Sequence, residues 1–545
     1  MLLFAYLAIE LKRRAPNSHT FLEVVRVRYG SCAHWVYIFF GLLTNCIVTA
    51  MLLLGGSATI SFLTGMSVYA CCMLLPLGVI VYTAFGGIKA TFLMDYTHTC
   101  IIFIIILIFV FTVYATSPMI GSIDNMYGLL QAAAKANPVV DNAGGEFVTM
   151  SSVGGIVFGV INIVGNFGTV FVDNAYWQRA IASHPRYAVK GYLIGGLAWF
   201  AIPFTLATTM GLAGQALQLN LLPKDVGAGL VLPAAATVLM GKGGAAASLL
   251  IIFMAVTSAL SAELIAVSSV ITYDVYICYI NPKPSNEQVK FVADCTIVGY
   301  GILAGIMAII LDAIGVNLGY LYELMGILIT GAVYPLACAL VWNKQNLAAV
   351  ISAPIIATAC AIIGWLVCAK HLYGKVDMDT TGADYPMLAG NVLALFIPVP
   401  IVHICTFFAP DNFDFNLMKE GIEIIENEEG TAKQKMEELQ LDEKQLKESS
   451  DFAAVSSFVL TLLLIIVWPL PLFFSGYVFT KGFFRGWVVF SIMWVWWSTF
   501  AVGVYPIYEN WGSITEVFGN IGKDLCGDGY KKGEVKSVEV IDIDE

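Results

Sequence analysis

Long apolar stretches, each close to the length needed to cross a lipid bilayer, recur along most of this chain. A membrane-spanning α-helix needs about 20 predominantly apolar residues, and several of these stretches are longer, which allows a helix to tilt or to break. A chain with so many of them is restricted to a bundle of membrane helices. We predict twelve spans, near residues 33–63, 69–86, 97–116, 152–178, 191–213, 244–274, 291–312, 318–342, 347–369, 387–409, 452–475 and 486–508.

The composition agrees with a polytopic membrane protein. Of the 545 residues, 58% are hydrophobic and 12% are charged, whereas soluble domains carry about 25% charged residues. The formal net charge of −11 does not indicate a partner, because much of it lies in one loop and the C-terminal tail. The 12 cysteines form no CxxC pair, and most lie in or beside apolar stretches, so we expect packing rather than metal binding or disulfides. We expect the lipid bilayer as a partner and no nucleic acid.

Lysine and arginine residues in the short loops predict the orientation of the spans. They are concentrated in the first connection, between residues 12 and 28. If successive spans cross the membrane in alternating directions, most other basic loops lie on the same side of the membrane as this connection. The positive-inside rule assigns that side to the cytosol. Lys481 and Arg485 fall on the opposite side and do not fit the rule.

Two long connections and the tail lie outside the spans. Residues 117–150 are predicted to form an extracellular loop with some helix. Residues 410–451 are acidic, and they are predicted to lie in the cytosol as a solvated linker or, alternatively, as a regulatory or partner-binding segment. The tail, residues 509–545, is polar and is also predicted to be cytosolic.

One apolar stretch, residues 249–276, carries a carboxyl group and several hydroxyls. An ionisable group at membrane depth usually faces a cavity, an ion or a partner rather than lipid. At about 100° per residue, small residues, two serines and a glutamate share one arc of about 140°. These residues are Ala255, Ser258, Ala259, Ala262, Glu263, Ala266 and Ser269. The arc fits either a transport site with oxygen ligands or a tight helix–helix contact in which Glu263 is hydrogen-bonded for structure.

The connection at residues 82–98 combines a glycine pair with a carboxylate. Gly86 and Gly87 are predicted to break the helix at the cytosolic face, and Asp95 opens the next span. Asp95 is a candidate ion-coupling residue. Alternatively, it only caps the free amides at a helix N-terminus, where the helix dipole favours a carboxylate.

The span at residues 152–178 contains glycines at mid-depth. Gly165 and Gly168 flank Asn166, and Asn162 lies one turn earlier. A glycine-rich interruption at this depth is tolerated only where the backbone lines a cavity or is buried in protein. The asparagines offer both donors and acceptors, which suit a small neutral amide, so these four residues are candidate substrate-binding residues. The alternative is a glycine kink that serves helix packing.

Further polar residues are candidates for gating or substrate contact. Asp173, Gln178 and Arg179 lie towards the cytosolic end of their span. Asp173 and Arg179 form either an inner-gate ion pair or interfacial charges that reach water. Glu323, inside the apolar span 318–342, either faces a substrate cavity or caps its helix near the outer surface.

Three ordered motifs resemble the sodium:solute symporter family. They are Tyr82-Thr83 with Gly86-Gly87 and Asp95, then Asp173-Asn174 with Gln178-Arg179 and Lys190-Gly191, then the stretch that ends in Tyr273-Asp274-Val275-Tyr276. His98 and Asn174 each stand where that family usually has Gln. Within the family, the segments HTFLEVVRVRYG, GNFGTVFVDNAYWQRA and AVTSALSAELIAVSSVITYDVY are most similar to the urea active transporters of fungi and plants.

The resemblance implies an all-α, five-plus-five inverted-repeat transporter fold with extra helices at the C-terminal end. It divides the chain into a remnant of a transmembrane helix (1–11), a core of about ten spans (12–409), an acidic loop (410–451), two final spans (452–508) and the tail (509–545). The first core helix of that family and most of the second have no counterpart in this sequence. Because that first helix supplies part of the ion and substrate sites, we expect the chain as printed to transport poorly or not at all.

The function that the resemblance implies is secondary active import of urea across the plasma membrane, without enzymatic activity or a cofactor besides a coupling ion. The alternatives are a polyamine or another small solute as substrate, and a passive urea channel as the class of protein. Relatives that use sodium bind it with one backbone carbonyl and two adjacent serines, which correspond here to Ala255, Ser258 and Ala259, so one hydroxyl is missing. We therefore favour protons over sodium, with Asp95 or Glu263 as the titrating group.

Overall fold

The computed structural model describes residues 1–545 except 184, 423–442, 510, 513–514 and 516–545. The described part of the chain consists of helices, with turns and two isolated β-bridges between them. Twelve helical segments within it are long and apolar enough to cross a membrane, and they correspond one to one with the predicted spans. Most of the predicted acidic loop and tail lies outside the described residues.

The first part of the chain contains α1 (Leu2–Arg14), α2 (Phe21–Tyr29), α3 (Ser31–Thr64) and α4 (Val68–Phe111), which a π-helical turn, η1 (Thr112–Thr116), extends. Inside α4, Gly87 has a φ of 55°, a left-handed conformation that glycine adopts without steric cost. The kink divides α4 into the spans Val68–Gly87 and Thr91–Thr116. The predicted break at the glycine pair is therefore confirmed.

The middle of the chain carries the helices that surround the polar residues. They are α5 (Ile123–Ala136), η2 (Ala143–Gly145), α6 (Val153–Val172), α7 (Asn174–Ala182), α8 (Pro185–Leu206), η3 (Ala207–Gly211), α9 (Leu212–Ala216), α10 (Pro223–Gly227), α11 (Val231–Met240), α12 (Lys242–Ser269) and η4 (Val270–Ile280). Helix α6 runs without interruption through Gly165 and Gly168, so the predicted break at these glycines is wrong. The chain leaves the helix at Asp173, whose side chain caps α7 by accepting a hydrogen bond from the Ala175 amide at 2.7 Å.

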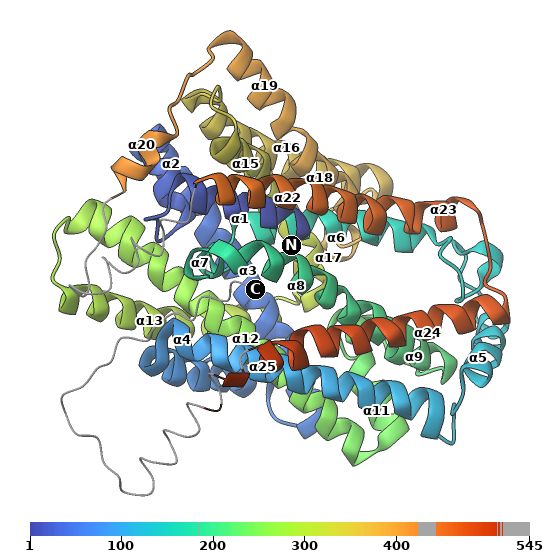
Figure 1. The fold of residues 1–545 in the computed structure, drawn as a ribbon. Helices are drawn as coiled ribbons and strands as arrows, with labels where there is room; N and C mark the ends of the chain where they lie inside the picture. The colour runs from blue at the N-terminus through green and yellow to red at the C-terminus, as the bar shows by residue number, and fades with distance from the viewer. Residues whose placement is uncertain (184, 423–442, 510, 513–514, 516–545) are drawn as a thin grey trace, which may run out of the picture.

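The remaining described helices complete the bundle. They are α13 (Asn286–Ala313), α14 (Leu318–Ile329), η5 (Thr330–Ala332), α15 (Val333–Val341), α16 (Leu347–Tyr373), α17 (Met378–Thr381), α18 (Asp384–Phe396), α19 (Pro398–Phe408), α20 (Asn416–Gly421), α22 (Glu443–Leu462), η6 (Leu463–Val467), α23 (Pro469–Phe474), α24 (Lys481–Ser498), η7 (Thr499–Val504) and α25 (Tyr505–Glu509). Helices α22 and α24 run along the side of the bundle (Figure 1).

Helix α12 is the central element of the packing, because it contacts α3, α4, α7, α11 and α13. Buried apolar side chains such as Leu53 of α3 and Leu260 of α12 fill the space between these helices. Where α7 crosses α12, Ala175, Ala262 and Ala266 form a separate small cluster. Short side chains allow two helix backbones to approach closely, which brings polar groups beside them within reach of each other.

The outer surface of the bundle is apolar. On α19, for example, Phe407 and Phe408 are 81% and 80% exposed. Exposed apolar area of this kind on spanning helices fits contact with lipid hydrocarbon rather than with water. The structure therefore agrees with the predicted multi-pass membrane protein.

Helix α5 meets the start of α24 at one end of the bundle (Figure 1). Asp124, in the first turn of α5, forms ion pairs with Arg485 and, at 3.3 Å, with Lys481. The hydrogen bond from Arg485 lowers the pKa of Asp124 to about 2. The two cations that do not fit the positive-inside rule are thus matched by a carboxylate from the loop 117–150, which lies on the same side of the bundle.

Candidate functional site

Two buried carboxyl groups and one amide meet where α6 passes into α7. The Nδ2 atom of Asn45, on α3, donates to Asp173 Oδ1 and to Glu263 Oε2 of α12, each over 2.7 Å. All three side chains are buried. We call these residues the carboxyl cluster. Since the three come from α3, α12 and the α6–α7 junction, the cluster joins the central helix to two of its neighbours.

The local sequence explains why Asp173 lies there. Its carboxylate caps α7, where the free amides and the dipole of the helix favour a negative charge. The next residue, Asn174, is also buried, and its Nδ2 donates to the carbonyl of Ala266 on α12 at 3.4 Å. The alanine contact between α7 and α12 brings Asp173 beside Glu263, so that Asn45 Nδ2 reaches both carboxyl groups.

The carboxyl cluster has more acceptors than donors. In the cluster, Asn45 Oδ1 and Asp173 Oδ2 are buried oxygens without a hydrogen-bond donor, and the same holds for Oδ1 of the adjoining Asn174. A buried acceptor without a donor costs about 1–3 kcal/mol. The arrangement therefore favours a species that brings protons or positive charge to these oxygens.

A second cluster lies next to the first and consists of Asp95, Arg179 and Ser258. Arg179 Nη2 on α7 is 2.7 Å from Asp95 Oδ2 on α4, and the Ser258 hydroxyl on α12 donates to Asp95 Oδ1. We call these residues the ion-pair cluster. The Asp95 side chain is 22% exposed and that of Arg179 is 29% exposed, so this cluster has more access to its surroundings than the carboxyl cluster.

Two predictions about these charges are corrected by the structure. Asp95 lies inside the segment Thr91–Thr116, where its side chain pairs with Arg179 and Ser258, so it is not only a helix cap. Arg179 pairs with Asp95 rather than with Asp173, so the predicted Asp173–Arg179 ion pair is wrong. The physical reason is that Asp173 caps the N-terminus of α7, whereas Arg179 lies in the last turn of that helix and reaches Asp95 on α4.

The positions that correspond to a sodium site are occupied differently here. The Ser258 hydroxyl is bonded to Asp95, and its carbonyl accepts from the Ser261 hydroxyl at 2.8 Å. Ala259 has no hydroxyl to offer. Ala255 is exposed on α12. Gln178 is buried on α7, one residue before Arg179.

The asparagines of α6 form a third group, at a different level of the bundle. Asn166 Nδ2 donates to Asn162 Oδ1 at 2.7 Å and to the hydroxyl of Tyr322, on α14, at 3.0 Å. Tyr322 in turn donates to Asn162 Oδ1, and its ring stacks on Phe158 at 6.2 Å between centroids. Tyr322 was not among the residues predicted from the sequence, although it stands directly beside the candidate Glu323.

The glycines of α6 serve packing. A Cβ at Gly165 would lie 2.8 Å from the Met325 Cε, and one at Gly168 would lie 2.6 Å from the Ile329 Cγ1, both on α14. Gly326 faces Gly165, since a Cβ there would lie 3.0 Å from the Gly165 Cα. These close approaches agree with the alternative, a helix–helix contact, and contact of the two glycines with substrate stays a prediction.

Glu323 is separate from the other candidates. It is half-buried on α14, where its backbone carbonyl accepts a hydrogen bond from Asn391 Nδ2 at 2.9 Å. At the far end of α12, His34 and Thr20 bond to Asp274 at 2.9 and 3.0 Å. This anchor could not be predicted from the sequence, because the residues that bond to Asp274 are 240 or more positions away from it.

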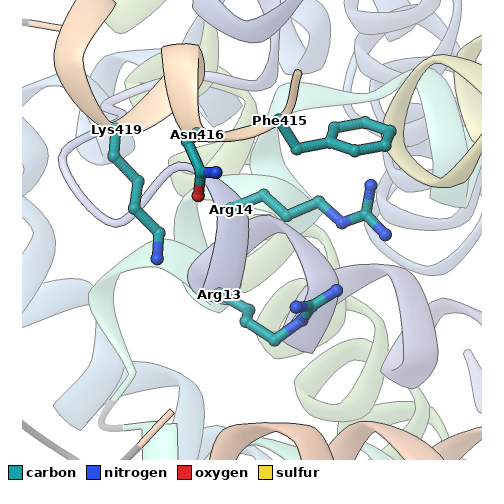
Figure 2. Close-up of a pocket in the computed structure, with 5 residues that line it drawn as sticks. All are labelled: Arg13, Arg14, Phe415, Asn416 and Lys419. Atoms are coloured by element: carbon teal, nitrogen blue, oxygen red, sulfur yellow. The ribbon is translucent and has the colours of Figure 1, made fainter. Parts of the chain in front are cut away.

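Two cavities lie away from all these residues. One, of about 100 Å³, is lined by Arg13 and Arg14 of α1 and by Phe415, Asn416 and Lys419 at α20 (Figure 2). The other, of about 200 Å³, lies among Phe147–Met150, α8, η3 and α24. The candidate substrate residues line neither of these two cavities.

A bundle of membrane-spanning helices whose central members enclose carboxyl, amide and ion-pair groups defines a polytopic membrane transporter. The chain belongs to the sodium:solute symporter family, whose sequence pattern matches residues 1–356. The three motifs that resemble this family therefore identified it correctly.

The chain is similar to three curated urea transporters over nearly its whole length. It is 45% identical over 538 residues to the probable urea active transporter 1 of Schizosaccharomyces pombe, covering 97% of this chain and 80% of that protein. It is 43% identical to the urea active transporter of Saccharomyces cerevisiae, covering 97% and 82%, and 43% identical to the urea-proton symporter DUR3 of Oryza sativa subsp. japonica, covering 95% and 73%.

A solved structure shows the same fold. It is a Na⁺-coupled sialic acid symporter in a substrate-bound outward-open state, with a TM-score of 0.55 and 18% identity over 76% of this chain and 84% of that chain. The predicted class of fold, an all-helical five-plus-five transporter with added C-terminal helices, is confirmed by this likeness.

Proposed function

We propose that this protein imports urea across the plasma membrane as a proton-coupled symporter. The observation that carries the proposal is the 43–45% identity, over 95–97% of this chain, to relatives named as urea active transporters or as a urea-proton symporter. Urea has four N–H donors and one carbonyl acceptor. The Asn162–Asn166–Tyr322 group offers matching acceptors and donors once its internal hydrogen bonds open.

Proton coupling is supported by the chemistry of the central helix. Sodium requires several oxygen ligands. Here Ala259 lacks a hydroxyl, and the Ser258 hydroxyl is already bonded to Asp95. Buried carboxyl groups, by contrast, need only gain and lose a proton, and two of them lie together in the carboxyl cluster. Transport then requires the protein itself and the ion gradient, and no enzymatic step.

The orientation of the protein in the membrane follows from its loops. We place the basic segment 12–28 in the cytosol, together with the loop 410–451 and the tail 509–545. Because Asp124 forms ion pairs with Lys481 and Arg485, we assign these two cations to the same side as the loop 117–150, which this orientation makes the outer side. Their charges are then neutralised locally, so they do not oppose this orientation.

Uptake of labelled urea tests the proposal. The protein is expressed from its own gene in yeast cells without other urea transporters, and pH and sodium are varied separately. We expect accumulation above the external concentration, loss of accumulation with a protonophore, and no effect when sodium is replaced by choline. Uptake that only reaches equilibrium would indicate a passive channel, and dependence on sodium would overturn the proton coupling.

A further inference from the structure

We propose that the carboxyl groups of Asp173 and Glu263 share one proton and that this pair is the proton-binding site of the transport cycle. The amide of Asn45 keeps the two carboxyl groups in position by donating a hydrogen bond to each. The inference rests on the proposed proton-coupled function and names the site at which the proton is carried. The ion-pair cluster would then neutralise and position α7 rather than carry the proton.

The hydrogen-bond geometry favours a proton in this cluster. A primary amide has two N–H hydrogens, and Asn45 uses one for each carboxyl group over 2.7 Å. The same nitrogen atom therefore brings one oxygen of each buried carboxyl group close to an oxygen of the other. Two carboxylates offer each other no donor, whereas one bound proton turns one of them into a donor. Asp173 Oδ2 is a buried oxygen without a donor, so the site lacks a hydrogen that a bound proton supplies.

The charges around the pair lead to the same conclusion. The groups that act on it from neighbouring elements are Arg179 and Tyr176 on α7, Tyr300 on α13, and Asp95 on α4 through its bond to Arg179. Arg179 is the single cation among these described groups, and Asp95 already neutralises it. Two ionised carboxylates would therefore leave two uncompensated negative charges in a buried site, which is strongly unfavourable. One bound proton removes one of them.

The position of the cluster couples the proton to the helices. Asn45 belongs to α3, Glu263 to α12, and Asp173 to the break between α6 and α7. With one proton, the three side chains hold these elements together. Loss of that proton to water places two like charges across the alanine contact between α7 and α12, which favours separation of the two helices. In each transport cycle the pair takes up one proton from one side of the membrane and releases it on the other side. The number of protons is conserved, and no other reactant is needed.

Infrared difference spectroscopy on the purified protein tests this site directly. The C=O stretch of a protonated carboxylic acid is followed while pH is changed, in the unmodified protein, Glu263→Gln, Asp173→Asn and the control Asp312→Asn. Asp312 is a carboxyl on the spanning helix α13, but it is exposed and distant from the pair. Glutamine is close to glutamate in shape, and asparagine caps helices as well as aspartate, so both variants keep the local packing.

We expect one pH-sensitive C=O band in the unmodified protein, its loss in both Glu263→Gln and Asp173→Asn, and its retention in Asp312→Asn. Two results would overturn the shared proton. One is a pH-sensitive band that survives in either single variant, and the other is a spectrum without a band that both substitutions remove. If one variant does not fold, the other decides the outcome. The spectrum is recorded without urea transport, so it tests the shared proton independently of the proposed function. If the shared band is present but urea uptake is absent or driven by sodium, the proposed function is rejected and the shared proton is not.

Discussion

Replacement of Asn45 by alanine removes the link between the two carboxyl groups, and its effect on stability can be worked out from the structure. The amide donates one hydrogen bond to each carboxyl group over 2.7 Å. In the shared-proton state one acceptor is charged and the other is neutral. Hydrogen bonds to charged groups contribute about 1.5–3 kcal/mol, and neutral ones about 0.5–1.5 kcal/mol. We therefore predict that Asn45→Ala lowers the free energy of unfolding by about 2–4.5 kcal/mol.

The neighbouring Thr44→Ala is the matched control. Thr44 is equally buried on α3, but its hydroxyl donates only to the carbonyl of Phe40 in the same helix, at 2.8 Å. Its loss is expected to cost about 0.5–1.5 kcal/mol. The assay is unfolding in mixed micelles titrated with sodium dodecyl sulfate and followed by circular dichroism. If Asn45→Ala unfolds at the same detergent fraction as Thr44→Ala, the amide does not hold the carboxyl pair together.

Three further predictions concern other parts of the molecule. Gly326→Ala would place a Cβ in steric overlap with Asn391 Oδ1 and 3.0 Å from the Gly165 Cα, so we expect a loss of about 1–3 kcal/mol and less folded protein by size-exclusion chromatography; a normal yield would contradict the close packing of α14 against α6 and α18. Asp95→Asn removes an ion pair that is mostly buried and should lower urea uptake about fivefold to tenfold at unchanged surface expression; equal uptake would remove Asp95 from the mechanism. Because Arg485 lowers the pKa of Asp124 to about 2, below the unfolded value of about 3.9, this ion pair stabilises the protein above pH 4 and is lost as pH falls towards 2. The free energies of unfolding of the unmodified protein and of Asp124→Asn should therefore differ by a constant amount from pH 5 to 8 and converge below pH 4. A difference between the two free energies that changes between pH 5 and 8 would be incompatible with the lowered pKa.

The spans and one helix break could be predicted from the sequence because each depends on local properties. Length and apolarity identify a membrane helix, and all twelve segments were located in this way. The kink at Gly87 was predictable because its positive φ needs glycine. The glycines of α6 carried an ambiguous signal, since glycine at mid-depth fits both an interrupted helix and a close contact. Only the position of Gly326 on another helix decides in favour of packing.

The partners of the charged residues could not be predicted, because they depend on which helices are neighbours. Asp173 and Arg179 are close in sequence, yet each bonds to a residue on a different helix. Asn45 was missed altogether, although a lone asparagine inside the apolar span 33–63 was a visible signal. Its partners lie 128 and 218 positions away. Helical periodicity placed Glu263 on a polar arc, but the identity of the group opposite it required the structure.

Simultaneous measurement of urea and proton movement tests the central claim most directly. The protein is reconstituted into liposomes, labelled urea is followed together with an internal pH dye, and Glu263→Gln is measured in parallel. One shared proton predicts that one proton enters with each urea in the unmodified protein, and that Glu263→Gln carries urea, if at all, without protons. Urea accumulation driven by sodium, or a proton-to-urea ratio that Glu263→Gln leaves unchanged, would contradict the account.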